Sequence, residues 1–349
     1  MTVAGKDGQT VVYEEEAVSL EPLAGKVVAV LGYGTQGRAQ ALNLRDSGVE
    51  VVIGSRPRSI TGKRAVADGL TVLTVDEATA RGDVVVFLVP DEAMAGLYRR
   101  KVVQLLKPGA ALAFAHGFAI VNEQIVPEPG RPCFLVAPKG QGDALREAFQ
   151  RGGGLPGLLA VTEDSPPETW ELAKSYAKAI GCLKGGGFPT TFREECVADQ
   201  FGEQVVLCGG VMELLQAAFD TLVGRGYSPG NAYFECVHEL KLIADLLHRY
   251  GLDGMRKRIS RTAAYGGLTR GTRVIDQRVR QSMEGILTEI EDGTFAREFL
   301  TRYSDPGVGI LALASKEAQT PLARAGRSLM QRLAALELED DLTYDPDKE

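Results

Sequence analysis

The feature that most constrains the fold of this chain is a glycine-rich turn between an apolar run and a helical pattern. Residues 26–59 of the 349-residue sequence are KVVAVLGYGTQGRAQALNLRDSGVEVVIGSRPRS. The β-branched run at 27–31 predicts a buried strand, the residues after the glycines predict a helix, and 49–53 predict a second strand. A G-x-G-x-x-G pattern alone is a weak signal, but this order of strand, helix and strand is the context that a dinucleotide-binding turn requires.

The glycine-rich turn is predicted to bind the pyrophosphate of a dinucleotide. In such turns the first glycine permits a tight turn, the second lets the backbone approach the pyrophosphate, and the third lets helix and strand pack closely. The start of the following helix then faces the phosphates. The predicted cofactor-binding residues of the turn are Gly32, Tyr33, Gly34, Thr35, Gln36 and Gly37. The alternative is an ordinary turn between a strand and a helix.

The residues after the second strand bear on the choice between NADH and NADPH. An NAD site usually has a carboxylate there to bind the ribose 2′-OH, whereas the segment IGSRPRSITGK contains none. Arg56, Arg58, Ser59 and Thr61 offer guanidinium groups and hydroxyls, which suit a 2′-phosphate. We therefore expect NADPH as the cofactor. The alternative is a solvated basic loop.

Further apolar runs in the first half predict a doubly wound α/β sheet. They occur in DVVVFLVPDE, GAALAFAHGF, PCFLVAPKG and GLLAVTED, with helical or loop segments between them. The carboxyl ends of the strands border the ligand crevice in such a sheet. His116 and Lys139 follow two of these runs and are therefore candidate site residues. The alternative for either residue is a loop cap.

The segment GGGFPTTFREE interrupts this pattern and predicts a domain boundary. After it the strand patterns stop and helical periodicity takes over. We expect an α/β Rossmann domain over residues 1–190 and an all-α domain over residues 191–335. The acidic end, residues 336–349, is expected to be disordered because it has few large apolar side chains.

Two predicted helices of the second half each carry two carboxylates four residues apart. Asp199 is paired with Glu203, and Glu235 is paired with Glu239. A helix places such positions on one face, where two like charges destabilise it unless a cation lies between them. Apolar neighbours predict that both helices are largely buried, and buried carboxylates need cations. We therefore predict a site for two Mg²⁺ or Mn²⁺ ions, which prefer oxygen ligands.

Two alternatives for these carboxylates stay open. One is a pair of solvated helix faces. The other is a di-iron carboxylate site, because Glu235 and His238 form a Glu-x-x-His pattern. Di-iron bundles use a second copy of that pattern, which we do not find in the sequence.

Composition and charge argue against several classes of function. The net charge of −7 argues against a nucleic-acid-binding surface. The N-terminus lacks a basic region followed by an apolar run, and no stretch offers about eighteen consecutive apolar residues. We therefore expect a cytoplasmic protein with no membrane partner. Five cysteines without C-x-x-C spacing argue against disulfides and structural zinc.

Beyond these patterns, the strings AFAHGF, APKG, TTFREE, DQFGEQVVLCGG and YFECVHELKLI resemble ketol-acid reductoisomerase in its short bacterial form, class I. The resemblance extends from residue 14 to residue 335. It implies a Mg²⁺-dependent alkyl migration in 2-acetolactate or 2-aceto-2-hydroxybutyrate, followed by NADPH reduction to the 2,3-dihydroxy acid in branched-chain amino-acid synthesis. It also implies a knotted helical domain and at least a homodimer.

The same resemblance implies roles for the residues of the helical domain. Asp199 bridges two Mg²⁺ ions, Glu203 binds one of them, and Glu235 and Glu239 serve the other directly or through water. Glu239 is also the first candidate for a catalytic base or acid. Ser260 binds the substrate carboxylate. Glu235, Glu239 and Ser260 are expected to complete the site of the partner subunit.

On the Rossmann side, the resemblance implies that His116 and Lys139 line the active site. The sequence departs from the family pattern at three places near that site: residues 140–143 are GQGD where a Pro-Gly-His type loop is common, Ala264 stands for Glu, and Pro189 stands for Glu. These changes leave open a paralogue that reduces a different 2-keto or 2-hydroxy-3-keto acid. A non-catalytic NADP(H)-binding sensor is the more distant alternative, and retained activity with Mg²⁺ would exclude it.

Overall fold

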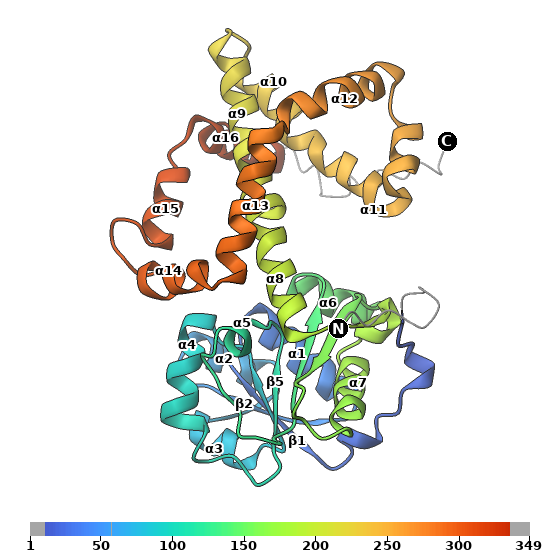
Figure 1. Cartoon of the computed structure of the whole chain (residues 1–349), viewed down its shortest axis with the longest axis vertical. Helices are drawn as coiled ribbons and strands as arrows, with labels where there is room; N and C mark the ends of the chain where they lie inside the picture. Colours follow the sequence, from blue (N-terminus) through green and yellow to red (C-terminus); the bar gives the residue numbers. More distant parts are fainter. Residues whose placement is uncertain (1–10, 57, 336–349) are drawn as a thin grey trace. The chain divides into compact units, whose positions relative to one another are not determined.

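The computed structural model describes residues 11–56 and 58–335 (Figure 1). The chain divides into two compact units, Met1–Ala198 and Asp199–Glu349. This division falls inside helix α8 (Phe192–Gly202), whereas the boundary predicted from the sequence lies just before that helix. The acidic end at 336–349, predicted to be disordered, lies outside the described residues.

The first unit contains an eight-stranded sheet with the order β3-β2-β1-β4-β5-β6-β7-β8. All neighbouring strands are parallel except β6 and β7, which are antiparallel. Chain order reverses between β1 and β4, and ligands bind at the carboxyl ends of the strands beside such a reversal. The strands are β1 Val27–Leu31, β2 Glu50–Gly54, β3 Thr71–Leu73, β4 Val84–Phe87, β5 Ala111–Phe114, β6 Cys133–Pro138, β7 Gly157–Val161 and β8 Gly187–Pro189.

Helices cover both faces of this sheet, as the near-continuous apolar strands require. Side chains of a strand alternate between its faces, so Val28 and Val30 of β1 belong to one buried cluster, and Ala29 and Leu31 belong to the other. Helices α1, α2, α6 and α7 contribute to the first cluster, and α3, α4 and α5 to the second. Their bounds are α1 Thr35–Asp46, α2 Ile60–Ala67, α3 Val75–Arg81, α4 Asp91–Leu97, α5 Phe118–Val121, α6 Gly142–Gln150 and α7 Thr169–Ala179.

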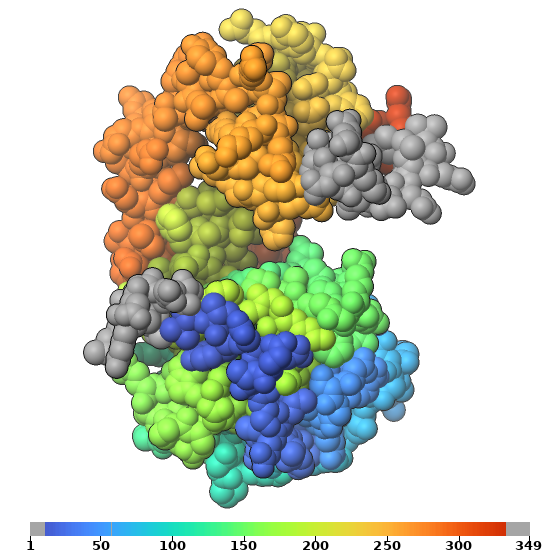
Figure 2. All heavy atoms as spheres, turned by 90° about the vertical axis from the view of Figure 1, so that its right-hand side faces the viewer, coloured from blue at the N-terminus to red at the C-terminus, as the bar shows by residue number. Residues whose placement is uncertain are grey.

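Short helical segments complete the first unit. They are η1 Glu15–Ala17, η2 Glu21–Leu23, the π-helical η3 Tyr98–Val102 and η4 Cys182–Gly185. The segment before β1 packs along α7, where Nζ of Lys178 donates to the carbonyl oxygens of Glu15 and Val18 at 2.9 and 2.7 Å. Figure 2 shows this segment, in blue, on the surface of the unit.

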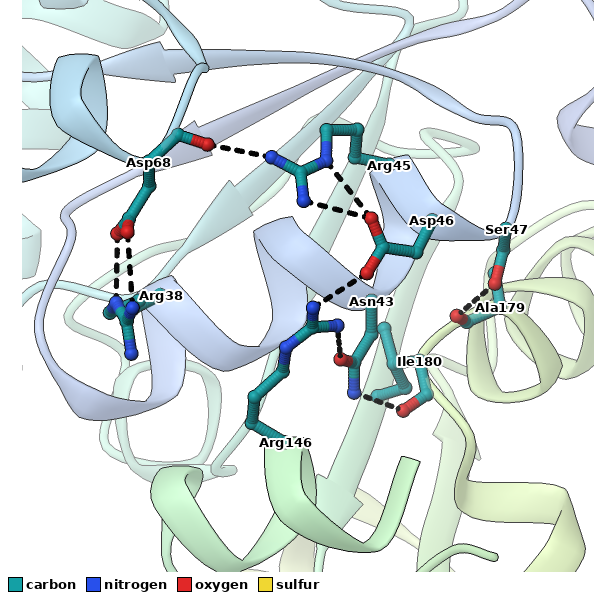
Figure 3. A network of polar contacts seen from close by, with 9 residues as sticks. All are labelled: Arg38, Asn43, Arg45, Asp46, Ser47, Asp68, Arg146, Ala179 and Ile180. Carbon is teal, nitrogen blue, oxygen red and sulfur yellow. Dashed lines mark hydrogen bonds and ion pairs between the residues drawn. The ribbon is translucent and has the colours of Figure 1, made fainter. Parts of the chain in front are cut away.

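Polar contacts join α1 to its neighbours (Figure 3). Arg146 of α6 donates to Asn43 at 2.8 Å and to Asp46 at 2.6 Å. Arg38 donates twice to the carboxylate of Asp68, which follows α2, at 2.8 and 3.0 Å. These contacts fix α1, and with it the glycine-rich turn that precedes α1, against both neighbouring helices.

The described residues of the second unit form helices joined by short turns and contain no strand. Beyond α8 it comprises η5 Glu203–Leu207, α9 Gly210–Gly224, α10 Pro229–Tyr233, η6 Phe234–His238, α11 Glu239–Arg258, α12 Arg261–Val274, α13 Gln277–Glu291, α14 Thr294–Arg302, α15 Ile310–Glu317 and α16 Pro321–Ala335. A small buried cluster of Phe219, Ala232 and Tyr233 packs against apolar side chains of α16. The knotted arrangement implied by the resemblance stays a prediction.

The prediction that the carboxylate-bearing helices are largely buried is wrong for the single chain. Val206 and Leu240 are 47% and 38% exposed, and Phe201 and Phe234 are half-buried. The physical reason is that the small cluster of the second unit leaves the apolar faces of these helices uncovered within one chain. The argument that burial alone demands cations at these carboxylates therefore does not hold for this unit by itself.

One helical stretch, Phe192–Gly224, is long and apolar enough to cross a bilayer, with a mean hydropathy of 1.5. Only 11% of its most apolar window is buried. Length and composition alone do not distinguish a membrane span from a helix that another protein chain covers.

Candidate functional site

A cavity of about 1010 Å³ lies in the first unit at the carboxyl ends of the strands. It extends from Thr74 after β3 to His116 after β5, which is about 19 Å because these strands are four spacings of about 4.8 Å apart. The predicted site residues that line it are Gly32, Tyr33, Gly34, Thr35, Gln36, Arg56, Ser59, Thr61 and His116. Gly37 and Arg58, also predicted as cofactor-binding, are not among the lining residues.

The three glycines of the turn have the distinct environments that a dinucleotide site needs. Gly32 has φ +103°, and a Cβ there would clash with the backbone of Leu88. A Cβ on Gly34 would meet nothing within 4 Å, so a ligand can approach this backbone closely. A Cβ on Gly37 would clash with the carbonyl of Gly32, so its role is the close packing of α1 on β1.

The loop after β2 is held together by hydroxyl contacts. Ser59 is the N-cap of α2, and its Oγ accepts a hydrogen bond from the N–H of Gly62 at 3.0 Å and donates to the carbonyl of Arg56 at 2.7 Å. Oγ1 of Thr61 lies 3.2 Å from Oγ of Ser59. A cap of this kind fixes the loop, and its residues Arg56, Ser59 and Thr61 line one end of the cavity.

Sequence reasoning missed an ion pair that lines the same cavity. Nζ of Lys101, in the π-helical η3, lies 3.0 Å from a carboxylate oxygen of Asp76, in the first turn of α3. Neither residue belongs to the segment after β2, where an NAD site usually has its carboxylate. The cavity therefore holds a carboxylate as well as the basic loop.

A second group of polar side chains lies where β5 and β6 end. Glu195 of α8 is 1% exposed, and its Oε2 lies 3.1 Å from Nδ1 of His116 and accepts the N–H of Gly117 at 2.8 Å. Nζ of Lys139 donates to Oε1 of the same carboxylate at 3.3 Å. The structure thus brings the predicted residues His116 and Lys139 together through a carboxylate that was not predicted.

The electrostatics of this group favour an ionised Glu195. Burial alone raises the pKa of its carboxyl group, but the hydrogen bond with His116, the charges of His116 and Lys139 and the N–H of Gly117 together lower that pKa below its usual value. Gly117 permits the approach because a Cβ there would clash with the carbonyl of Phe192 at the start of α8. Glu195 lies four residues before Asp199, a spacing that could have identified it from the sequence.

The predicted metal ligands lie on two helical stretches. Asp199 follows Glu195 by one turn of α8 and is half-buried, while Glu203, Glu235 and Glu239 are exposed. Ser260 is the N-cap of α12, where its Oγ accepts the N–H of Ala263 at 3.1 Å.

Each carboxylate pair lies at a π-helical turn that the sequence did not indicate: the first pair ends where η5 begins, and the second spans η6. Glu203 begins η5, where its carbonyl accepts the N–H of Cys208 at 2.8 Å, and Glu235 lies within η6. The wider π turn changes the α-helical alignment of Glu235 and Glu239, and such turns occur frequently at functional sites. His238, of the alternative Glu-x-x-His pattern, packs edge-on against Phe234 at a centroid distance of 5.5 Å.

A mostly parallel sheet with this glycine-rich cavity is typical of a dinucleotide-binding protein. Residues 22–186 match the family model described as acetohydroxy acid isomeroreductase, NADPH-binding domain, and residues 192–334 match the ketol-acid reductoisomerase C-terminal domain. The chain belongs to the ketol-acid reductoisomerase family. The resemblance and the fold class predicted from the sequence are thereby confirmed.

Solved structures agree with this assignment. An NADH-preferring ketol-acid reductoisomerase from an uncultured archean is 39% identical, with a TM-score of 0.87 over 92% of this chain and 98% of that one. A semialdehyde dehydrogenase NAD-binding protein from Cupriavidus necator is 20% identical, with a TM-score of 0.57 over 76% of this chain and 99% of that one. A pyrroline-5-carboxylate reductase from Coxiella burnetii is 12% identical, with a TM-score of 0.52 over 76% and 96%. The last two share the fold alone.

The family defines the reaction. Ketol-acid reductoisomerases carry out a Mg²⁺-dependent alkyl migration in 2-acetolactate or 2-aceto-2-hydroxybutyrate and then reduce the product to the 2,3-dihydroxy acid in valine, leucine and isoleucine biosynthesis. The cavity and the domain match make this chain an NAD(P)H-binding enzyme of that class.

Proposed function

We propose that this protein is an NADPH-dependent, two-Mg²⁺ ketol-acid reductoisomerase whose proton-handling group is His116, Lys139 and Glu195. The observation that carries the proposal is that His116 takes part in both sites, the dinucleotide cavity and the polar group around Glu195. Its side chain lines the dinucleotide cavity, and its ring contacts the buried Glu195. A nicotinamide ring bound at the β5 end of the cavity is then close to the titratable side chains of His116, Glu195 and Lys139.

The preference for NADPH rests on the loop after β2. Arg56, Ser59 and Thr61 line one end of the cavity, and a guanidinium with two hydroxyls suits a phosphate dianion. Asp76 at the same cavity is paired with Lys101, which offsets its repulsion of a phosphate. The archaeal relative prefers NADH, so the competing proposal is NADH, and comparable KM values for the two cofactors would remove the preference.

The proposed metal ligands are Asp199, Glu203, Glu235 and Glu239. All four offer carboxylate oxygens, the donors that Mg²⁺ prefers, and three of them are exposed and accessible to an ion. When bound, two such ions polarise the substrate ketone and acidify its hydroxyl, which favours migration and then reduction. We retain the proposal that Ser260 binds the substrate carboxylate.

The side chains around Glu195 have complementary proposed roles. Lys139 donates a hydrogen bond toward the substrate and holds positive charge near a developing oxyanion, while the ionised Glu195 fixes the orientation of both Lys139 and His116. His116 keeps the substrate end of the cavity polar. Glu239 is the proposed base or acid of the helical unit.

We further propose a homodimer or larger assembly in the cytoplasm, with neither nucleic acid nor membrane as a partner. The uncovered apolar faces of the helical unit support self-association, because soluble proteins rarely leave large apolar surfaces exposed. The net charge of −7 does not favour nucleic acid.

The test is NADPH oxidation by the purified protein with racemic 2-acetolactate and Mg²⁺. Asp199→Asn and a chelator are each expected to abolish turnover, whereas Glu213→Gln, an exposed carboxylate on α9, serves as the matched control. Turnover that persists without a divalent ion would contradict the metal proposal. Turnover absent in the unmodified protein, with NADPH still bound, would favour a paralogue with another 2-keto acid substrate.

A further inference from the structure

A chain of three buried or half-buried side chains leads from the core of the first unit to the loop that carries Lys139. The hydroxyl of Tyr176, on α7, lies 2.8 Å from Oε1 of Gln40. Nε2 of Gln40 lies 3.1 Å from Oε1 of Gln36, and Nε2 of Gln36 lies 2.9 Å from the carbonyl oxygen of Gly140. We call this series the glutamine relay.

The carbonyl of Gly140, at the outer end of the glutamine relay, determines which group donates and which accepts in every hydrogen bond of the relay. The carbonyl of Gly140 can only accept, so Gln36 must turn its NH₂ group toward it and its oxygen toward Gln40. Gln40 must then present its own NH₂ group to Gln36, which leaves its oxygen for the Tyr176 hydroxyl as donor. Gln40 and Tyr176 are each 1% exposed, so water does not compete for these groups.

The outer end of the glutamine relay joins two functional segments. Gln36 is the fifth residue of the glycine-rich turn and lines the dinucleotide cavity. Gly140 directly follows Lys139, in the loop between β6 and α6. Gly142 adds a second contact, because a Cβ there would clash with the carbonyl of Thr35 in the glycine-rich turn.

We propose that Gln36 is a positioning residue that, through the glutamine relay, holds the loop of Lys139 in register with the bound dinucleotide. Catalysis needs the Lys139 ammonium and the nicotinamide at a fixed separation, and these groups belong to different loops. The relay connects the two loops directly, with its inner end anchored at Tyr176. The inference rests on the proposed role of Lys139 in the active site.

The decisive variants alter the glutamine relay at its two ends. Gln36→Glu keeps the size of the side chain but turns a carboxylate oxygen toward the Gly140 carbonyl, so two acceptors face each other. Tyr176→Phe removes only the inner donor and leaves the cavity lining unchanged. Asp68→Asn is the matched control, because Asp68 holds the opposite side of the glycine-rich turn through the hydroxyl of Tyr33 at 2.8 Å.

Two measurements separate positioning from general damage. Steady-state kinetics should give a kcat about tenfold lower for Gln36→Glu and a smaller decrease for Tyr176→Phe, with the KM for NADPH within about threefold. Hydrogen exchange of the cofactor-free protein should be faster at residues 139–142 in both variants. Asp68→Asn should instead raise the KM for NADPH and leave exchange at 139–142 unchanged.

The proposal is overturned if Gln36→Glu has a normal kcat and normal exchange at residues 139–142, or if only its KM for NADPH rises, since Gln36 would then act solely as a cofactor ligand. Lys139→Met is measured in parallel. Full activity of that variant would overturn the role of Lys139, while faster exchange in the two relay variants would still establish that the relay holds the loop.

Discussion

Oε2 of Glu195 lies 3.1 Å from Nδ1 of His116, although the two residues come from α8 and from the turn after β5. The contact therefore links the start of α8, the helix that also contains Asp199, with the edge of the dinucleotide cavity at His116. An almost fully buried carboxylate is stable in its ionised form only with such partners. We therefore propose that Glu195 organises the active site in addition to its part in packing.

Glu195→Gln is expected to lower kcat about 100-fold, the usual size of a proton-transfer or charge-orienting contribution. Glutamine keeps the size and can still accept the N–H of Gly117, so the melting temperature should change little. Turnover at saturating cofactor and substrate is the measurement. Glu194→Gln is the control, because Glu194 is the exposed neighbouring carboxylate on α8, and an equal loss in both variants would contradict the assignment.

Asp68→Asn is expected to destabilise the first unit by about 1–3 kcal/mol near neutral pH, since Asp68 accepts charge-assisted hydrogen bonds from Arg38. Those hydrogen bonds, followed by the opposing effect of burial and the contact with Tyr33, lower the pKa of its carboxyl group. A carboxyl group with a lowered pKa stabilises the fold fully above its unfolded pKa of about 3.9 and loses that effect as the pH falls through its folded pKa.

The measurement for Asp68 is urea unfolding of both proteins at several pH values. The difference in unfolding free energy between the unmodified protein and Asp68→Asn should be constant above about pH 5 and shrink as the pH falls below about 4. A difference that stays the same at acid pH would mean that the charge of Asp68 contributes nothing.

The sequence predicted those parts of the molecule that depend on local pattern. The glycine-rich turn and the strands around it follow from residue spacing, because a strand, a tight turn and a helix are all specified within a few residues. Glu195 was missed although it lies four residues before Asp199, because the partners that make it significant, His116 and Lys139, are distant in sequence. The burial of Val206 was predicted wrongly because an apolar helix face does not indicate whether the same chain covers it.

The π-helical turns at Glu203 and Glu235 could not be predicted by the same means. Their hydrogen bonds join residues five apart, whereas those of an α-helix join residues four apart. No residue type specifies this change. The sequence therefore indicated the candidate carboxylates but not the π-helical backbone next to them. The wider turn η6 displaces Glu235 and Glu239 from the simple arrangement of positions four apart, whereas the pair of Asp199 and Glu203 ends where η5 begins.

Arg56→Gln is expected to raise the KM for NADPH about tenfold and to change the KM for NADH little, because one charge-assisted contact to the 2′-phosphate is lost. Arg56 lines the cavity, whereas Arg58 does not, although the sequence suggested both. Arg58→Gln is therefore the matched control and should change either KM by less than about threefold. Equal effects of Arg56→Gln on the two cofactors would contradict a 2′-phosphate site.

Self-association is expected to cover the helical unit, where Leu268 of α12 is 66% exposed. Leu268→Asp should shift the protein toward smaller species in sedimentation at low micromolar concentration and lower its melting temperature, because a charge within an apolar interface is left without a partner. Val126→Asp is the control, since Val126 is similarly exposed, at 67%, on the first unit. A monomer in the unmodified protein would contradict this prediction. A protein that requires detergent to stay in solution would instead favour a bilayer as the cover of the stretch Phe192–Gly224.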